Sequence, residues 1–81
     1  MNYTDAIALA KAENEEGFNY LYESTYKSKY YLALRYMKDE DLAKDVLQDA
    51  YIKAFAKLDT LCNPEVFSSW FGQIIANTAK N

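Results

Sequence analysis

The segment Asp41–Phe55, DLAKDVLQDAYIKAF, restricts the fold of this chain most, because its apolar residues recur at the spacing of one helical face. The apolar set, extended one turn further, is Leu42, Val46, Leu47, Ala50, Ala54, Phe55 and Leu58. Such a stripe normally buries a helix against its own domain. The segment therefore predicts an amphipathic helix, Asp41–Leu58, whose apolar side lies in the core of a helical protein.

The opposite side of the same predicted helix is acidic. Its outward residues are Asp41, Asp45, Gln48, Asp49 and Ile52. The three nearby lysines fall to the flanks: Lys44, Lys53 and Lys57. A solvated helix face usually mixes charges of both signs. Charge alone leaves two interpretations open, a solvated face and a surface that docks onto a basic partner.

A chain of 81 residues has room for one small domain, residues 1–81, and no second core. A hydrophobic content of 51% is enough for a packed interior. Two glycines and one proline leave few breaks in the chain, which favours helices over strands and turns. We expect an all-α fold, a small bundle of three main helices plus a short N-terminal helix.

Capping and breaking residues set the expected helix boundaries. Thr4 is the expected cap of the short first helix, and Gly17 is its expected end or bend. A long helix is expected over Phe18–Met37. Its expected core stripe is Phe18, Leu21, Tyr22, Tyr26, Tyr30 and Leu34.

The second half of the chain has clearer signals. Asp39 is a capping candidate for the acidic helix, and a short loop is expected over Asp59–Asn63. Asn63 followed by Pro64 marks the start of the last helix. Because no glycine or proline stops that helix before Asn81, we interpret the end of the chain as a cut.

Several classes of function are disfavoured by composition. Histidine is absent and Cys62 is the single cysteine, which excludes a disulfide framework, a Cys/His zinc site and histidine-based catalysis. We expect no enzyme, no metal and no cofactor. The sequence has no apolar run long enough to span a bilayer and no secretory signal. We therefore expect a cytoplasmic protein without a membrane partner.

Two motifs carry a resemblance to a known family. DVLQD at Asp45–Asp49, followed by YIKAF, resembles the helix with which sigma-70-type transcription initiation factors bind the RNA polymerase clamp. FSSWF at Phe67–Phe71 and IIANTA at Ile74–Ala79 resemble the promoter-reading helix of the extracytoplasmic-function branch. Together the motifs cover roughly Gly17–Asn81.

The resemblance implies a region 2 domain, which binds polymerase and the −10 promoter element. The second domain of relatives, which reads the −35 element, is absent from these 81 residues. The chain is therefore interpreted as a fragment or a stand-alone remnant.

The same resemblance implies core RNA polymerase as a partner, contacted at the coiled coil of its largest subunit. The implied contact residues are Asp41, Asp45, Gln48, Asp49 and Ile52. Carboxylates can pair with arginines of that coil, and Ile52 adds apolar area. An anti-sigma factor is a further expected partner.

The second implied partner is the −10 element as a single strand. In the family, the loop before the last helix and that helix capture a base flipped out of the opening promoter. The candidate DNA contacts are Leu61, Asn77, Lys80, Lys53, Lys57 and Trp70. Asn77 matches an asparagine that reads a base edge, a task that suits an amide because it donates and accepts. Two alternatives stay open, a solvent-facing amide for Asn77 and a packing role for Trp70.

The sequence also departs from the family. Gly72–Gln73 stands where relatives commonly have an aromatic residue and an arginine, and loss of that cation predicts weaker DNA binding. A basic stretch is either a solvated face or a contact for the non-template strand: Lys27, Lys29, Arg35 and Lys38. Two other hypotheses remain. The chain is a degenerate sigma domain that binds polymerase or an anti-sigma factor without DNA, or an unrelated helical bundle that oligomerises through its tyrosines.

Overall fold

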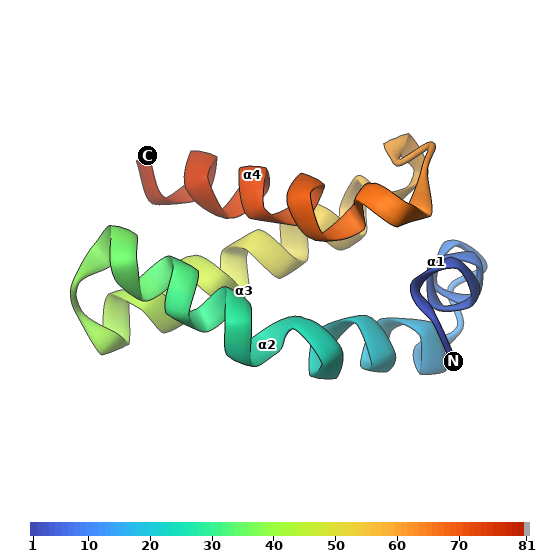
Figure 1. Ribbon diagram of the computed structural model, residues 1–81, viewed down its shortest axis with the longest axis horizontal. Helices are drawn as coiled ribbons and strands as arrows, with labels where there is room; N and C mark the ends of the chain where they lie inside the picture. The colour runs from blue at the N-terminus through green and yellow to red at the C-terminus, as the bar shows by residue number, and fades with distance from the viewer. Residues whose placement is uncertain (81) are drawn as a thin grey trace.

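The computed structural model describes residues 1–80, which form a bundle of α-helices (Figure 1). The elements in chain order are α1 Tyr3–Lys11, α2 Glu15–Met37, α3 Glu40–Ala56, the 3-10 turns η1 Leu58–Thr60 and η2 Pro64–Val66, and α4 Phe67–Lys80. This confirms the expected all-α fold, three main helices after a short leading one. The expected continuation of the last helix through Asn81 concerns a residue outside those described.

Side chains cap the helices at their first turns. The capping residues are Asn2 for α1, Asn14 for α2, Asp39 for α3 and Asn63 for η2. Each accepts a hydrogen bond from a first-turn amide that has no partner within the helix. The cap expected at Asp39 is confirmed. Asn63 caps the turn η2, which leads directly into α4, so α4 itself begins at Phe67 and not at Pro64 as expected. The cap expected at Thr4 is wrong, because α1 starts at Tyr3 and the Asp5 amide donates to Asn2 Oδ1 at 2.9 Å.

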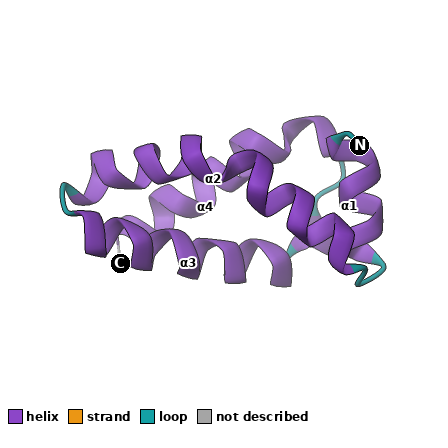
Figure 2. Ribbon diagram, turned by 90° about the horizontal axis from the view of Figure 1, so that it is seen from below, coloured by secondary structure: helices purple, strands orange, loops and turns teal. Residues whose placement is uncertain are grey.

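The main helices enclose one core. Helices α2 and α3 run side by side and are joined by a tight turn (Figure 2), and α4 packs against both. Lys38 makes the turn in the left-handed conformation, with a φ of 56°. The largest fully buried side chains are Phe67, Phe71, Ile7, Leu21, Leu47, Ile75 and Thr25. Among the described residues, no helix combines the length and apolar character needed to cross a lipid bilayer.

The inward side of α3 differs from the predicted stripe at Leu42, which is exposed, and at Ala43 and Tyr51, which are buried although the stripe did not include them. Leu42 was expected in the core, but 48% of it is exposed. At about 100° per residue, Leu42 projects only about 60° from Asp45, which faces outward. Its neighbour Ala43 projects about 160° from Asp45 and is buried. The buried residues of α3 are Ala43, Val46, Leu47, Ala50, Tyr51 and Ala54.

The α1–α2 crossing depends on Gly17, which does not end α1 as expected. Helix α1 ends at Lys11, and Gly17 lies buried in the first turns of α2. A Cβ at Gly17 would lie 2.5 Å from the Ala10 nitrogen and would also clash with the Ala6 carbonyl oxygen. Only glycine therefore allows the two backbones to approach this closely.

The two glycines give a matched test of this crossing. At Gly72 an added Cβ would make ordinary contacts, 3.7 Å from Leu32 Cδ2 and 3.8 Å from Lys29 Nζ. We expect Gly17→Ala to lower the free energy of unfolding by about 1–3 kcal/mol through overpacking. Gly72→Ala should raise it by about 0.5–1 kcal/mol, because alanine is the better helix former. Urea unfolding followed by circular dichroism measures both, and equal effects would contradict the proposed close crossing.

Candidate functional site

The outward side of α3 presents the residues predicted for docking. We call this set the acidic face: Asp41, Asp45, Gln48, Asp49 and Ile52. All five side chains are exposed, and Ile52 is 61% exposed. At about 100° per residue they occupy an arc about 100° wide. The apolar side chain of Ile52 is thus exposed to water among acidic residues. Such a mixture is more typical of a binding surface than of a merely solvated helix face.

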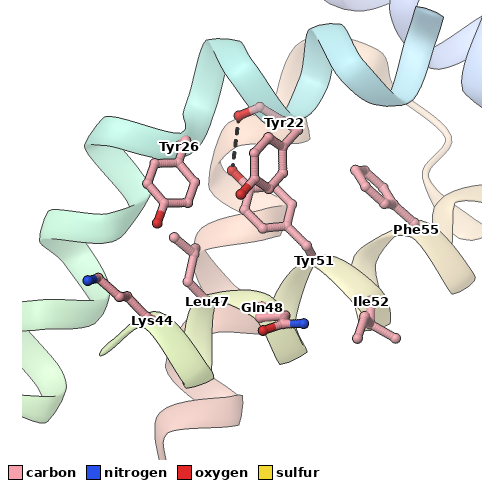
Figure 3. A pocket seen from close by; sticks show the side chains of 8 residues that line it. All are labelled: Tyr22, Tyr26, Lys44, Leu47, Gln48, Tyr51, Ile52 and Phe55. Atoms are coloured by element: carbon pink, nitrogen blue, oxygen red, sulfur yellow. Dashed lines mark hydrogen bonds between the residues drawn. The ribbon is translucent and has the colours of Figure 1, made fainter. Parts of the chain in front are cut away.

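A groove lies beside the acidic face, between α2 and α3 (Figure 3), with a volume of about 480 Å³. We call it the tyrosine groove, lined by Tyr22, Tyr26, Lys44, Leu47, Gln48, Tyr51, Ile52 and Phe55. Gln48 and Ile52 belong to both sets, so the acidic face and the groove form one continuous surface. The groove could not be expected from the sequence, because the helical spacing of Tyr22 predicts a core position, whereas 45% of Tyr22 is exposed.

Hydrogen bonds hold the floor of the tyrosine groove in place. The Tyr51 hydroxyl lies 2.6 Å from Thr25 Oγ1 and donates to the Tyr22 carbonyl at 3.3 Å (Figure 3). The Thr25 hydroxyl donates to the Leu21 carbonyl at 2.6 Å. Burial raises the pKa of Tyr51 to about 12, and the hydrogen bond with Thr25 opposes this shift. The groove therefore has a neutral, preorganised floor.

Two of the predicted DNA contacts on α4, Asn77 and Lys80, are exposed. Asn77 and Lys80 lie three residues apart on α4, so their side chains share a face. Lys53 Nζ donates to Thr78 Oγ1 at 3.3 Å, which brings the end of α3 beside this part of α4. Gln73 Nε2 donates to Asn77 Oδ1 at 3.3 Å, which leaves the Asn77 amide hydrogens to donate elsewhere. Lys57 is also exposed at the end of α3.

Leu61 does not lie where a base could reach it. Its side chain is 3% exposed and forms part of the core, and its carbonyl accepts a hydrogen bond from Lys11 Nζ at 2.9 Å. Burial of the Leu61 side chain in the core therefore speaks against the expected contact with DNA. The sequence of a loop does not indicate which way a side chain points. In the structure, Leu61 follows the η1 turn and its side chain points into the core. Thr60 and Cys62 on either side are exposed instead.

Two other candidates have packing contacts. Trp70 is half-buried, with its ring centroid 6.0 Å from that of Phe67, which supports the packing interpretation. Lys29 Nζ donates to the Ser68 carbonyl at 3.0 Å and to the Ser68 hydroxyl at 2.9 Å. Burial lowers the pKa of Lys29. Lys29 is thus a tie between α2 and α4, whereas the rest of the basic stretch is exposed: Lys27, Arg35 and Lys38.

The family described as Sigma-70 region 2 matches residues 21–81 of the chain. The chain belongs to this family. The resemblance carried by DVLQD and FSSWF is therefore confirmed. The match also excludes the hypothesis that the chain is an unrelated helical bundle.

Curated relatives place this region 2 domain in the extracytoplasmic-function branch. RNA polymerase sigma factor SigV of Bacillus subtilis strain 168 is 42% identical over 50 residues, which are 62% of this chain and 30% of SigV. The ECF RNA polymerase sigma-E factor of Escherichia coli strain K12 is 32% identical over 80 residues, 96% of this chain and 41% of that factor. The domain thus spans less than half the length of these relatives. No solved structure matches it.

The floor of the tyrosine groove predicts how the domain responds to alkali. The pKa of Tyr51 is about 12 when folded, against about 10 for an unfolded tyrosine. Above pH 10 the folded state therefore binds more protons than the unfolded state, and stability falls between about pH 10 and pH 12. Below pH 10 the contribution of Tyr51 is fully present.

Tyr51→Phe should flatten this alkaline loss, although it also costs about 1 kcal/mol at neutral pH through its lost hydrogen bonds. The matched control is Tyr36→Phe, because Tyr36 is 47% exposed. Thermal unfolding midpoints from pH 8 to pH 11.5 measure the effect. Parallel pH profiles for the parent and Tyr51→Phe would show that Tyr51 titrates normally.

Proposed function

We propose that this domain binds core RNA polymerase through the acidic face and the adjoining tyrosine groove, and holds the opened −10 promoter strand with α4. It would act in the bacterial cytoplasm as part of a transcription initiation factor. The observation that carries the proposal is the exposed acidic face on a helix whose other side is locked into the core. The proposed partner surface is the coiled coil in the clamp of the largest polymerase subunit.

The chemistry of the surface suits such a coil. Asp45 and Asp49 lie one turn apart and can each pair with an arginine in bidentate geometry. Gln48 adds a hydrogen bond at the junction with the groove. A stable interface needs about 800 Å² from each partner, more than one helical face of this length provides. The tyrosine groove between α2 and α3 supplies additional apolar area next to Ile52. An apolar side chain of the partner that entered the groove would be excluded from water.

The promoter strand would be held on α4. Asn77 offers amide hydrogens to a base edge, and Lys80 offers a cation to a phosphate. Lys53 lies beside the same part of α4 through its contact with Thr78. Because the domain has a net charge of −3, polymerase must supply most of the phosphate binding. Holding an unpaired base shifts the strand-separation equilibrium toward the open promoter.

A second candidate function shares the docking surface without a role in DNA. In this alternative the domain binds polymerase or an anti-sigma factor and reads no promoter. The buried position of Leu61 favours it, because the base-stacking contribution of the loop is lost. The neutral pair Gly72–Gln73 also favours it, because relatives commonly carry an arginine there. Promoter-strand binding separates the two candidates.

Charge reversal on α3 tests polymerase docking. We expect Asp45→Arg/Asp49→Arg to weaken binding to core polymerase by about 100-fold or more, because two attractive pairs become repulsive. The control is Asp5→Arg/Glu13→Arg, which makes the same charge change on exposed residues at the α1 end of the molecule. Biolayer interferometry with immobilised core polymerase measures both. Equal affinities for the two double variants would exclude the acidic face as the docking surface.

Asn77→Ala tests strand recognition. The probe is a randomised single-stranded DNA library, captured by the domain–polymerase complex with capture by polymerase alone subtracted. We expect enrichment of the preferred strands to fall about tenfold, since the amide contact to one base is lost. Asn19→Ala, the same change at an exposed residue of α2, is the control. Unchanged enrichment in Asn77→Ala would favour the function without DNA.

A further inference from the structure

The segment Leu58–Val66, which we call the promoter loop, has little regular structure of its own. It consists of η1 and η2, three residues each, joined by Leu61–Asn63. Its backbone hydrogen bonds are local, such as Leu61 N to the Leu58 carbonyl at 3.0 Å and Val66 N to the Asn63 carbonyl at 3.1 Å. Local turns shape the segment but do not place it relative to α4. Its placement therefore depends on contacts from elsewhere in the chain.

Helix α1 supplies such contacts in the middle of the promoter loop and just beyond its end. Lys11 Nζ, at the end of α1, donates to the Leu61 carbonyl at 2.9 Å. The Tyr3 ring, at the start of α1, lies 5.6 Å from the ring of Phe67, the first residue of α4. Helix α1 also contacts η1 and η2 directly. The loop is thus held by a helix that is distant in the sequence. Lys11 and Leu61 are 50 positions apart.

Helix α1 can place the loop because α1 is itself fixed on α2. Gly17 allows backbone contact with Ala6 and Ala10, which locks the crossing. The rings of Tyr3 and Tyr20 meet edge to face with centroids 6.2 Å apart. From α2, Lys29 holds Ser68 just after the loop. Helix α2 therefore fixes the position of α1, and α1 in turn fixes the position of the promoter loop.

We propose that Lys11 is a positioning residue for promoter-strand selectivity, acting through the Leu61 carbonyl without touching the strand. This inference rests on the proposed promoter function and deepens it. The charged ammonium makes a stronger hydrogen bond than a neutral donor would. It holds Leu61 in the core while the neighbouring Thr60 and Cys62 remain exposed on the loop. A loop already in its binding geometry loses less freedom when a strand arrives.

The test uses three variants. Lys11→Met removes the ammonium and keeps an apolar stem, and Lys11→Arg restores a cationic donor. Lys27→Met is the control, because it removes one positive charge from an exposed residue of α2. The first measurement is amide hydrogen exchange of the domain alone. The second is the ratio of best to worst base in the randomised single-stranded library, captured by the domain–polymerase complex.

We expect Lys11→Met to speed exchange at the Leu61 and Val66 amides by about tenfold, because a charge-assisted hydrogen bond is lost. Exchange in α3 should stay at the parent rate, as should binding to core polymerase. The base-selectivity ratio should fall severalfold in Lys11→Met and recover in Lys11→Arg. It should not change in Lys27→Met, because a contact from this exposed lysine to a strand phosphate would carry no base information. Recovery by arginine would distinguish positioning from a general loss of stability.

Unchanged loop exchange in Lys11→Met would overturn the inference, and so would an unchanged base-selectivity ratio. If the parent complex captures no strand beyond polymerase alone, the proposed promoter function fails. In that case hydrogen exchange alone decides whether Lys11 places the loop. The two failures are therefore distinguishable.

Discussion

The burial of one side of α3 is the constraint on which the surfaces of this domain depend. Leu47, Ala50 and Ala54 are at most 1% exposed, and both α2 and α4 pack against this helix. A helix whose one side is buried exposes its other side to water. The direction of Asp45 and Asp49 is therefore set by the packing of the buried side and not by interactions of the two carboxylates. The docking surface is thus a consequence of core packing. Its side chains are free to be chosen for binding, because they carry little of the stability.

The same helix relates the two proposed partners. Its outward side and the tyrosine groove face the proposed polymerase coil, whereas its last turns approach α4 through the hydrogen bond from Lys53 to Thr78. Polymerase docking and strand capture would therefore share one rigid element. A domain with a net charge of −3 would gain from this proposed arrangement, because a polymerase bound to it could bring the phosphates close.

The lysines of this domain have two different uses in the structure. Lys11 and Lys29 each donate to a backbone carbonyl, at Leu61 and at Ser68, and so connect the N-terminal half of the chain to the region around the promoter loop. Lys80 and Lys57 remain exposed. Charge alone did not separate the two groups, because a lysine stem can reach a carbonyl or a phosphate equally well. Only the tertiary structure decides it, because it places the Leu61 and Ser68 carbonyls within reach of Lys11 and Lys29.

Periodicity and capping residues by themselves determined the number of helices, the caps at Asp39 and Asn63 and the outward acidic face, because these follow from the local geometry of a helix. The motifs DVLQD and FSSWF determined the family. Only the tertiary structure decided that Gly17 is a crossing point, that Leu42 is exposed, that Leu61 is buried and that Tyr22 lines a groove. Each of these depends on which backbone or side chain from a distant segment lies opposite. The residue pattern along one helix does not reveal which segment that is.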